Sequence, residues 1–373
     1  MTRRASWVGI DAGADVVAIC ILDAAGSILR EGSAHASASA IEEALPKTKK
    51  GLLVGIEAGG TAIHLTRGLR QAGYDVRVLE TRHVHAFLEL RQNKSDRNDA
   101  RGIADVLRLG WQAVPEVFVK SERSQRLRSE LVLRQRLMQQ RIATESAMRG
   151  ILRSNGGNIT RAWSGAHLEK TVIAEIERLR ATGVDLGEVL LPTLEVVVMV
   201  RRTLETITRR LARVARDDEV CSRLMTVPGV GCISALSFYT AIDEPSRFIR
   251  NEDVGPYLGL APKLNQSGQS SRMGHISKRG NQMTRSHLVS AAKVLMQLSK
   301  QDNTLRRWAL ALKERAGPSK ARVALARRLA VVLLAIWKSG QRFDPQRIPT
   351  CPLAIGAEAH STAPASVTVA DKC

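Results

Sequence analysis

Aromatic residues, paired cysteines and long apolar runs are all scarce in this chain. Phe, Trp and Tyr make up 3% of the 373 residues, which excludes a binding surface built mainly from aromatic platforms for stacked bases. The five cysteines are odd in number and form no Cys-x-x-Cys pair, which argues against zinc sites and a disulfide framework. No apolar run approaches the roughly 20 residues that span a bilayer, and no signal peptide is visible. We therefore expect a cytoplasmic protein without a membrane partner.

Acidic residues are also in short supply. Lys and Arg number 56 against 36 Asp and Glu, which gives a net charge of +20. Residues 254–301 contain no Asp or Glu, whereas they do contain Lys263, Arg272, Lys278, Arg279, Arg285, Lys293 and Lys300. Such a balance is typical of proteins that bind nucleic acid or an anionic surface, so the sequence predicts a polyanionic partner.

Four acidic residues stand out against this basic background. Asp11 and Glu57 each end a strongly apolar run, and Asp96 and Asp99 lie three residues apart at the start of a predicted helix. A carboxylate at the end of a buried strand is costly without a cation, although acids in a first helical turn can simply complement the helix dipole. Carboxylates can hold two divalent ions over a phosphodiester. Together the four residues indicate nucleic-acid strand chemistry with Mg²⁺ or Mn²⁺.

The order of apolar runs predicts an α/β domain over residues 1–120. Strands are expected at 7–11, 16–22, 28–30, 52–56, 75–79 and 116–119, and helices near 38–45, 61–72 and 95–109. Alternating strands and helices are typical of an α/β sheet. Residues 341–373 are rich in Ala, Ser, Thr and Pro, which predicts a disordered tail.

Residues 121–220 are expected to be a helical linker. Apolar residues recur there at spacings of three and four, which is a heptad seam formed by Leu190, Val197, Val200, Leu204, Ile207, Leu211 and Val214. One helix packed on its neighbour within the subunit explains this seam. An intermolecular coiled coil that sets the oligomeric state explains it equally well.

Residues 221–340 are expected to form a mostly α C-terminal domain, with a helix at 319–339. The run from Leu224 to Gly231 resembles the turn of a helix-hairpin-helix element, in which Gly229 and Gly231 would let backbone N–H groups approach a phosphate. A plain Pro-Gly turn is the simpler alternative. Farther along, Ser, Gly and Asn crowd a basic loop that suits phosphate contact. Its expected contacts are Lys263, Arg272, Ser277, Lys278, Arg279, Asn281 and Arg285.

Several serines of this loop are candidate nucleophiles on chemistry alone: Ser267, Ser270, Ser271 and Ser277. Most serines in such a loop only donate hydrogen bonds to phosphate oxygens. A nucleophilic serine needs activation, and His275 is the nearest histidine along the chain, although a lone His in a polar loop is more often a binding residue.

The motifs together resemble one family. Gly9-Ile10-Asp11, Gly55-Ile56-Glu57 and Lys94-Ser95-Asp96-Arg97-Asn98-Asp99-Ala100 look like the DEDD signature of the insertion-sequence 110 family of transposases. The segments Pro262–Gly268 and Gly274–Asn281 look like that family's C-terminal motifs, although Ser270-Ser271 stands where a basic residue is common. The resemblance implies a ribonuclease-H-like domain similar to RuvC, with Asp11, Glu57, Asp96 and Asp99 as metal ligands. It also implies a serine transposase domain with Ser267 as the nucleophile, and Ser277 as a phosphate or structural contact.

The resemblance further implies what the protein does. A member of this family would cut and rejoin DNA through a phosphoserine link in the prokaryotic nucleoid. Its partners would be donor and target duplex DNA, a bridge RNA, and further copies of the chain in a dimer or tetramer. Three alternatives remain: a RuvC-type metal-dependent endonuclease without a covalent intermediate, an actin-like sugar kinase or ATPase suggested by the Gly9–Gly13 and Gly55–Thr61 segments, and a non-catalytic architectural DNA-binding protein.

Overall fold

The computed structural model describes residues 6–89, 95–110, 114–157, 167–267, 270–298 and 302–346 of the chain. Its contacts divide the chain into two compact units, Met1–Lys120 and Ser121–Cys373. From position 347 onward the predicted disordered tail lies outside the described residues. Among the residues described, no helix is both long and apolar enough to cross a membrane.

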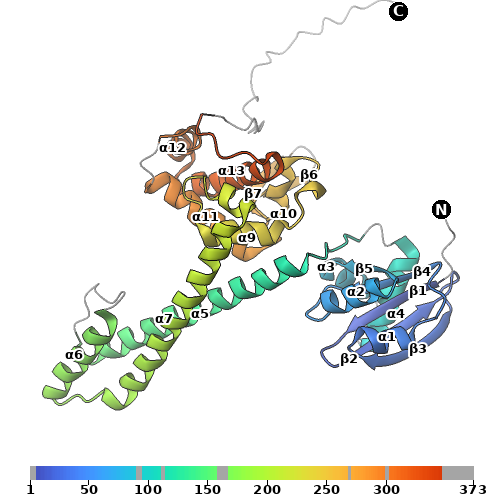
Figure 1. Ribbon diagram of the computed structural model, residues 1–373, viewed down its shortest axis with the longest axis horizontal. Helices are drawn as coiled ribbons and strands as arrows, with labels where there is room; N and C mark the ends of the chain where they lie inside the picture. Colours follow the sequence, from blue (N-terminus) through green and yellow to red (C-terminus); the bar gives the residue numbers. More distant parts are fainter. Residues whose placement is uncertain are drawn as a thin grey trace, which may run out of the picture. The chain divides into compact units, whose positions relative to one another are not determined.

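The first unit is built on a five-stranded mixed sheet (Figure 1). Its strands are β1 (Ser6–Ala12), β2 (Val16–Leu22), β3 (Ile28–His35), β4 (Leu52–Glu57) and β5 (Asp75–Leu79), in the order β3-β2-β1-β4-β5. β1 is antiparallel to β2 and parallel to β4, and β5 is parallel to β4. Consecutive apolar residues form β4 because a central parallel strand is covered on both faces.

Helices cover both faces of this sheet. They are α1 (Ala38–Ala44), α2 (Ala62–Gln71), α3 (Thr81–Leu88) and α4 (Asp96–Gly110). Val8 and Ile10 pack with residues of α1 and α2, whereas Leu53 packs with Ile103 and Leu107 of α4 on the opposite face. Successive strand residues point to opposite faces, so this alternation fixes which residues face α4.

The second unit is helical apart from one hairpin. Its elements are α5 (Glu122–Ser154), α6 (Leu168–Ala181), α7 (Gly187–Asp217), α8 (Glu219–Leu224), α9 (Cys232–Ile242), α10 (Val254–Tyr257), β6 (Pro262–Ser267), β7 (Ser270–Ile276), α11 (Gln282–Gln297), α12 (Thr304–Ala316) and α13 (Pro318–Ser339). Short 3-10 turns lie at Pro245–Arg247 and Asn251–Asp253. A single large apolar core joins α8 to α13 with the adjoining ends of α5 and α7.

The two longest helices, α5 and α7, pack against each other within the chain. They run antiparallel, since Glu130 pairs with Arg210 while Glu145, farther along α5, pairs with the earlier residue Arg201. Glu145 is only 8% exposed, and its carboxylate lies 2.8 Å from the Arg201 guanidinium. A buried carboxylate needs such a partner, so this pair favours one alignment of the two helices.

Most of the predicted heptad seam is buried in the core of this helical segment. The buried seam residues of α7 are Leu190, Val197, Val200, Leu204 and Leu211, while Ile207 and Val214 are partly buried. The alternative of packing within the subunit therefore describes the observed seam. A different stripe of α7 stays outside it, because Val189, Val196 and Met199 are 60%, 48% and 69% exposed.

The mixed α/β class predicted from the sequence is confirmed, with a mixed sheet in the first unit and a helical C-terminal part. Three local predictions differ from the structure. The strand expected at 116–119 is reduced to one bridge between Leu79 and Glu116. The segment expected to be a basic loop contains the β6–β7 hairpin, and α3 was not predicted.

Candidate functional site

Two of the predicted acidic residues lie at adjacent strand ends. Asp11 is next to last in β1 and Glu57 is last in β4, and the parallel register that pairs Ile10 with Ile56 brings the two carboxylates side by side. Both residues are half-buried. Asp11 lies two residues after Gly9 and Glu57 two residues after Gly55, so all four residues point to the same face of the sheet. Helix α4 covers that face.

Glycines explain why α4 approaches this face so closely. A Cβ atom on Gly9 would lie 2.0 Å from the carbonyl oxygen of Ala100, and one on Gly55 would lie 2.6 Å from a methyl carbon of Leu107. Only glycine leaves room for such contact. Asp99 near the start of α4 acts on Glu57 at the end of β4, whereas Leu107 farther along α4 packs against Gly55 and Leu53. The helix therefore runs antiparallel to β4 and to its parallel neighbour β1. The first turn of α4, which carries Asp96 and Asp99, therefore lies near the end of β1 that carries Asp11.

The electrostatics of Glu57 link three of these acids. Burial raises the pKa of Glu57, and the negative charges of Asp11 and Asp99 raise it further, while the nearby Thr81 hydroxyl and His85 act in the opposite direction. Like charges oppose ionisation of a neighbour, so Asp11, Glu57 and Asp99 share one local field. Asp96 is exposed one turn before Ala100 on the same helix.

This acidic group has the chemistry of a divalent-ion site. Carboxylate oxygens are the ligands that Mg²⁺ and Mn²⁺ prefer, and the mutual repulsion felt at Glu57 is the kind that a cation would relieve. No three His, Cys, Asp or Glu side chains in the described ranges converge closely enough to hold one ion. Ion binding would therefore require these carboxylates to turn toward a common point.

Two residues of this region were missed by the sequence analysis, and both lie on α3. Thr81 begins that helix directly after β5, and its hydroxyl donates a 2.8 Å hydrogen bond to the carbonyl of Ala58 as well as contacting Glu57. His85 follows one turn later, and its Nδ1 lies 3.2 Å from the Glu89 carboxylate. Their position along the chain was the available signal. They follow β5, the third parallel strand, and residues that follow parallel strands lie at the same edge of the sheet.

Asp105 does not belong with the four acids. Its carboxylate forms an ion pair with Arg108 at 3.1 Å, and both side chains are mostly buried. The negative charge of Asp105 also helps to raise the pKa of the Cys20 thiol. Cys20 is buried with Leu22 and with Ala104 of α4. The residue therefore has a structural ion pair on another part of the helix.

Ser267 ends a strand of the second unit. In the β6–β7 hairpin Ser267 pairs with Ser270, and Asn265 pairs with Arg272, so Ser267 and Ser270 face each other in the last described pair before the tip. The intervening Gly268 and Gln269 lie outside the described residues. For Ser267 and Arg272 the structure describes the backbone, which places both on this hairpin.

The base of the hairpin is fastened by backbone contacts between two motifs. The Ser277 N–H donates to the Ala261 carbonyl at 2.8 Å, and the Lys278 N–H donates to the Gly259 carbonyl at 3.2 Å. Gly259 and Gly280 have φ of +72° and +98°, and a Cβ on either would lie within 2.2 Å of a backbone oxygen of the other motif. The two glycines therefore allow the motifs to interlock beneath Ser267.

The predicted phosphate-contacting residues surround this base in two kinds of setting. Lys263, Lys278 and Arg279 are exposed, as a phosphate contact requires. Arg285 is partly buried, which lowers its pKa, and it donates to the Leu258 carbonyl at 3.0 Å. Asn281 caps α11 by accepting from the Thr284 N–H, so it already has a structural role.

The Ser277 hydroxyl has a local role as well, because it accepts a hydrogen bond from the Arg279 N–H at 3.4 Å. His275, by contrast, is exposed on β7.

The predicted helix-hairpin-helix element corresponds to α8, a turn, and α9. Gly229 has a φ of +89°, and a Cβ there would lie 2.5 Å from the Ala291 carbonyl oxygen of α11. Gly231 is the exposed N-cap of α9, and a Cβ there would meet open space. Close packing against α11 therefore explains why residue 229 is a glycine. At Gly231, by contrast, the N-terminus of α9 is accessible.

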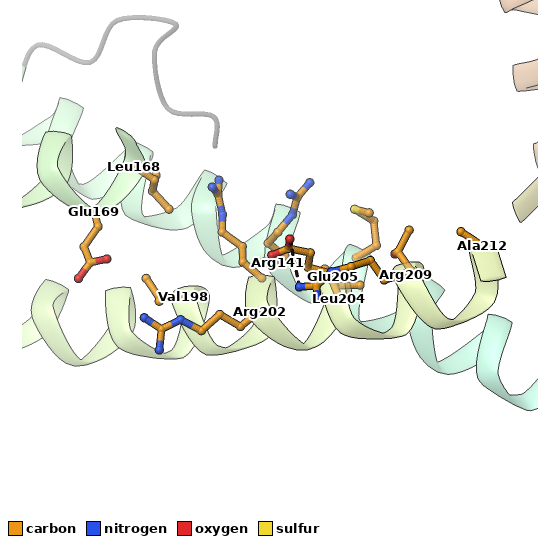
Figure 2. Close-up of a pocket in the computed structure, with 12 residues that line it drawn as sticks. Arg141, Leu168, Glu169, Val198, Arg202, Leu204, Glu205, Arg209 and Ala212 are labelled. Atoms are coloured by element: carbon orange, nitrogen blue, oxygen red, sulfur yellow. Dashed lines mark ion pairs between the residues drawn. The ribbon is translucent and has the colours of Figure 1, made fainter. Parts of the chain in front are cut away.

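A hollow of about 650 Å³ lies among α5, α6 and α7 (Figure 2). Four arginines line it, and three of them lie beside carboxylates. Arg201 and Arg141 are 2.8 Å and 3.7 Å from Glu145, and Arg209 is 3.2 Å from Glu205. Because these acids neutralise most of the local positive charge, the hollow is poorly suited to hold a polyanion.

Comparison with known proteins gives two family matches. A family model named for the DEDD transposases of IS110, and described as a transposase, matches residues 8–155. A second model, described as the transposase IS116/IS110/IS902 family, matches residues 221–307. The first range contains all four acids of the sheet edge, and the second contains Ser267 and the hairpin.

Similar proteins include three named transposases. The chain is 28% identical to the transposase for insertion sequence element IS1111A of Coxiella burnetii, over 88% of each chain. It is 30% identical to a protein of Pseudomonas aeruginosa named "Probable family 20 transposase", over 76% of this chain and 83% of that one. The transposase for insertion sequence element IS1328 of Yersinia enterocolitica is 28% identical, over 78% and 85%.

Proposed function

Because this chain belongs to the IS110 family of transposases, we propose that it cuts and rejoins DNA through a covalent link to Ser267. The observation that carries the proposal is the position of Ser267 near the tip of a hairpin, above a base fixed by Gly259 and Gly280. A serine near the tip of a hairpin, with exposed Lys263, Lys278 and Arg279 around the base of that hairpin, suits attack on a phosphodiester held by cations.

The reaction balances without an external energy source. The Ser267 oxygen loses its proton and forms a bond to phosphorus, while the bond from phosphorus to the 3′ oxygen breaks and that oxygen gains a proton. A second DNA 3′-hydroxyl then attacks the phosphorus and releases the serine hydroxyl. The number of phosphoester bonds is unchanged at each step, so strand exchange can proceed in either direction.

The acids of the first unit have a supporting role in this proposal. Asp11, Glu57, Asp96 and Asp99 would hold Mg²⁺ or Mn²⁺, which when bound supplies positive charge to the phosphate and the leaving oxygen. The Thr81 hydroxyl, held by its hydrogen bond to the Ala58 carbonyl, lies close enough to Glu57 to lower its pKa, and so would restrain that carboxylate. Glu57 and Asp11 follow the register pair Ile56–Ile10 on neighbouring strands, and the charge of Asp11 raises the pKa of Glu57.

One reconstitution tests the proposal. The purified chain is incubated with donor DNA, target DNA, Mg²⁺ and the RNA transcribed from beside its gene, and tryptic peptides are examined by mass spectrometry. We expect a nucleotide-bearing peptide that contains Ser267. We also expect omission of the transcript to abolish strand exchange, because family resemblance implies a bridge RNA. Strand cleavage without any such peptide would support a RuvC-type nuclease instead.

Replacing Thr81 by Val should weaken the metal-dependent step. The variant keeps the size of the side chain but loses the hydroxyl that restrains Glu57, and groups that orient metal ligands are typically worth about 10–100-fold in affinity or activity. We expect the Mg²⁺ concentration for half-maximal cleavage to rise about tenfold. Thr81→Ser, which retains the hydroxyl, should behave like the wild type. If the Val and Ser variants needed the same Mg²⁺ concentration for half-maximal cleavage, Thr81 would have no role in the metal site.

We also propose that the chain assembles as a dimer or tetramer through α7. The exposed stripe of Val189, Val196 and Met199 has spacings of seven and three, which is the repeat of a coiled-coil face. Met199→Lys should therefore shift sedimentation toward the monomer, whereas Leu298→Lys, at an equally exposed position that caps the C-terminus of α11, should not. A Met199→Lys variant with the sedimentation of the wild type would contradict this assignment.

A further inference from the structure

Three helices of the second unit enclose a small hollow that the proposed chemistry does not use. Its volume is about 60 Å³. Lys293 of α11, Lys313 of α12 and Arg322 of α13 line it, together with the apolar side chains of Met296, Leu310 and Pro318. The lining therefore includes one basic residue from each of three helices that pack against one another.

Few acidic groups lie near the basic residues of this hollow. Among the described residues that line it none is acidic, and residues 254–301, which include all of α11, contain no Asp or Glu. Within the described part of the chain, Lys313 alone of the three forms an ion pair, at 3.7 Å with the exposed Glu314. Like charges close together repel, so an anion placed among them would be attracted by all three.

The size of the hollow fits one phosphate group. A water molecule needs roughly 10–15 Å³ by the same kind of measure, so 60 Å³ holds about four to six atoms of that size. Phosphorus with four oxygens is such a group. Pro318 also begins the 22-residue α13, whose N-cap Gly317 makes no side-chain cap, so the positive end of the helix dipole adds to the attraction.

The contrast with the larger hollow of the helical segment supports this choice. There, Arg141 and Arg201 lie beside Glu145, and Arg209 lies beside Glu205 (Figure 2). An arginine with a carboxylate within 4 Å has much of its charge already neutralised, whereas Lys293 and Arg322 form no ion pair with any residue that the structure describes. Each basic residue of the smaller hollow therefore attracts an anion more strongly than an arginine of the larger hollow does.

We propose that Lys293, Lys313 and Arg322 bind one backbone phosphate of a nucleic acid during transposition. This inference rests on the proposed function, because a transposase must hold its nucleic acid over a long surface. Lys313 and Arg322 lie beyond residues 221–307 of the family match, so the site extends that surface into the last two helices. Duplex DNA and the flanking RNA carry the same phosphate chemistry, and the experiment distinguishes them.

The test measures the salt dependence of binding by the full chain. A triple variant, K293Q/K313Q/R322Q, removes three charges but keeps aliphatic stems over Met296 and Leu310. The affinity of the variant is measured from low to moderate salt for two ligands separately. One is the duplex donor DNA, and the other is the RNA transcribed from beside the gene. Each phosphate contact on duplex DNA contributes about 0.9 to the slope of log affinity against log salt. Because the hollow binds one phosphate, we expect that slope to fall by about 1 for the nucleic acid that occupies it.

The control triple variant, R178Q/R180Q/R307Q, removes the same charge from arginines already paired with Glu175, Asp185 and Asp302. A greater fall than the control on duplex DNA identifies DNA, and a greater fall on the transcript identifies RNA. Slopes that match the control in both arms would overturn the proposal. The Ser267 adduct, scored separately by mass spectrometry with the wild type, reports on the proposed function independently of this result.

Discussion

Replacing Ser267 by Ala should abolish the covalent protein–DNA link and reduce strand exchange by roughly 10⁴-fold or more. The alanine lacks the oxygen that would bond to phosphorus, and no other group would take its place. The backbone of Ser267 pairs with Ser270 in the hairpin, and alanine can form the same pair. We therefore expect the variant to fold and to bind duplex DNA with nearly the affinity of the wild type.

Ser270→Ala is the matched control for this prediction. Ser270 has the same side chain and stands opposite Ser267 in the same register pair, so the two substitutions perturb the hairpin alike. Only Ser267→Ala should remove the nucleotide-bearing peptide and the strand-exchange product. If Ser267→Ala retained the adduct, another serine would be the nucleophile. If it lost the adduct but still nicked DNA at the rate of the wild type, water would be the attacking group.

The sheet of the first unit could be predicted because its strands have simple signals. Residues 52–56 form an apolar run, residues 75–79 alternate charged and apolar side chains, and β4 and β5 occupy nearly those ranges. Asp11 and Glu57 could be grouped from the sequence because each ends a strongly apolar run, and the parallel pairing of β1 with β4 brings the ends of those two strands together. The short helix α3 gave no such signal, because Val84 is its only buried residue.

The hairpin that carries Ser267 was harder to predict for a physical reason. Its strands are rich in Ser, Gly, Asn and Gln and lack the apolar alternation that marks a half-buried strand. Backbone contacts with a distant motif stabilise its base instead, as the Gly259–Arg279 and Gly280–Tyr257 approaches show. Such contacts depend on Gly259 in one motif and Gly280 in the other. These glycines are 21 residues apart, and the sequence alone does not show that their motifs meet.

The heptad seam illustrates a third limit. Its spacing predicted a packed helix correctly, since Val197, Leu204 and Leu211 are buried. The spacing alone did not say which helix they meet, because a partner from the same chain and one from a second copy satisfy the same pattern. Ion pairs across α5 and α7, such as that of Glu145 with Arg201, distinguish the pairing within the chain.

Replacing Asp11 by Asn should have opposite effects on activity and on metal-free stability. We expect strand exchange to fall by roughly 10³-fold or more, because the variant loses a carboxylate that holds charge at the phosphate. The metal-free protein should instead become more stable. Asp11 helps to raise the pKa of Glu57, so at neutral pH the two ionised groups repel in the folded state. Solvent screens half-buried charges, so we expect a gain of a few tenths of a kcal/mol to about 1 kcal/mol.

Thermal unfolding with and without Mg²⁺ measures both effects in one experiment. The wild type should unfold at a higher temperature when Mg²⁺ is added, because a ligand that binds only the folded state stabilises it, and Asp11→Asn should lose most of that shift. The metal-free gain should shrink as pH falls, because protonated Glu57 no longer repels a neighbour. Asp105→Asn is the control: it breaks the ion pair with Arg108, so it should lower stability and keep the Mg²⁺ shift. A full Mg²⁺ shift in Asp11→Asn would exclude Asp11 from the metal site.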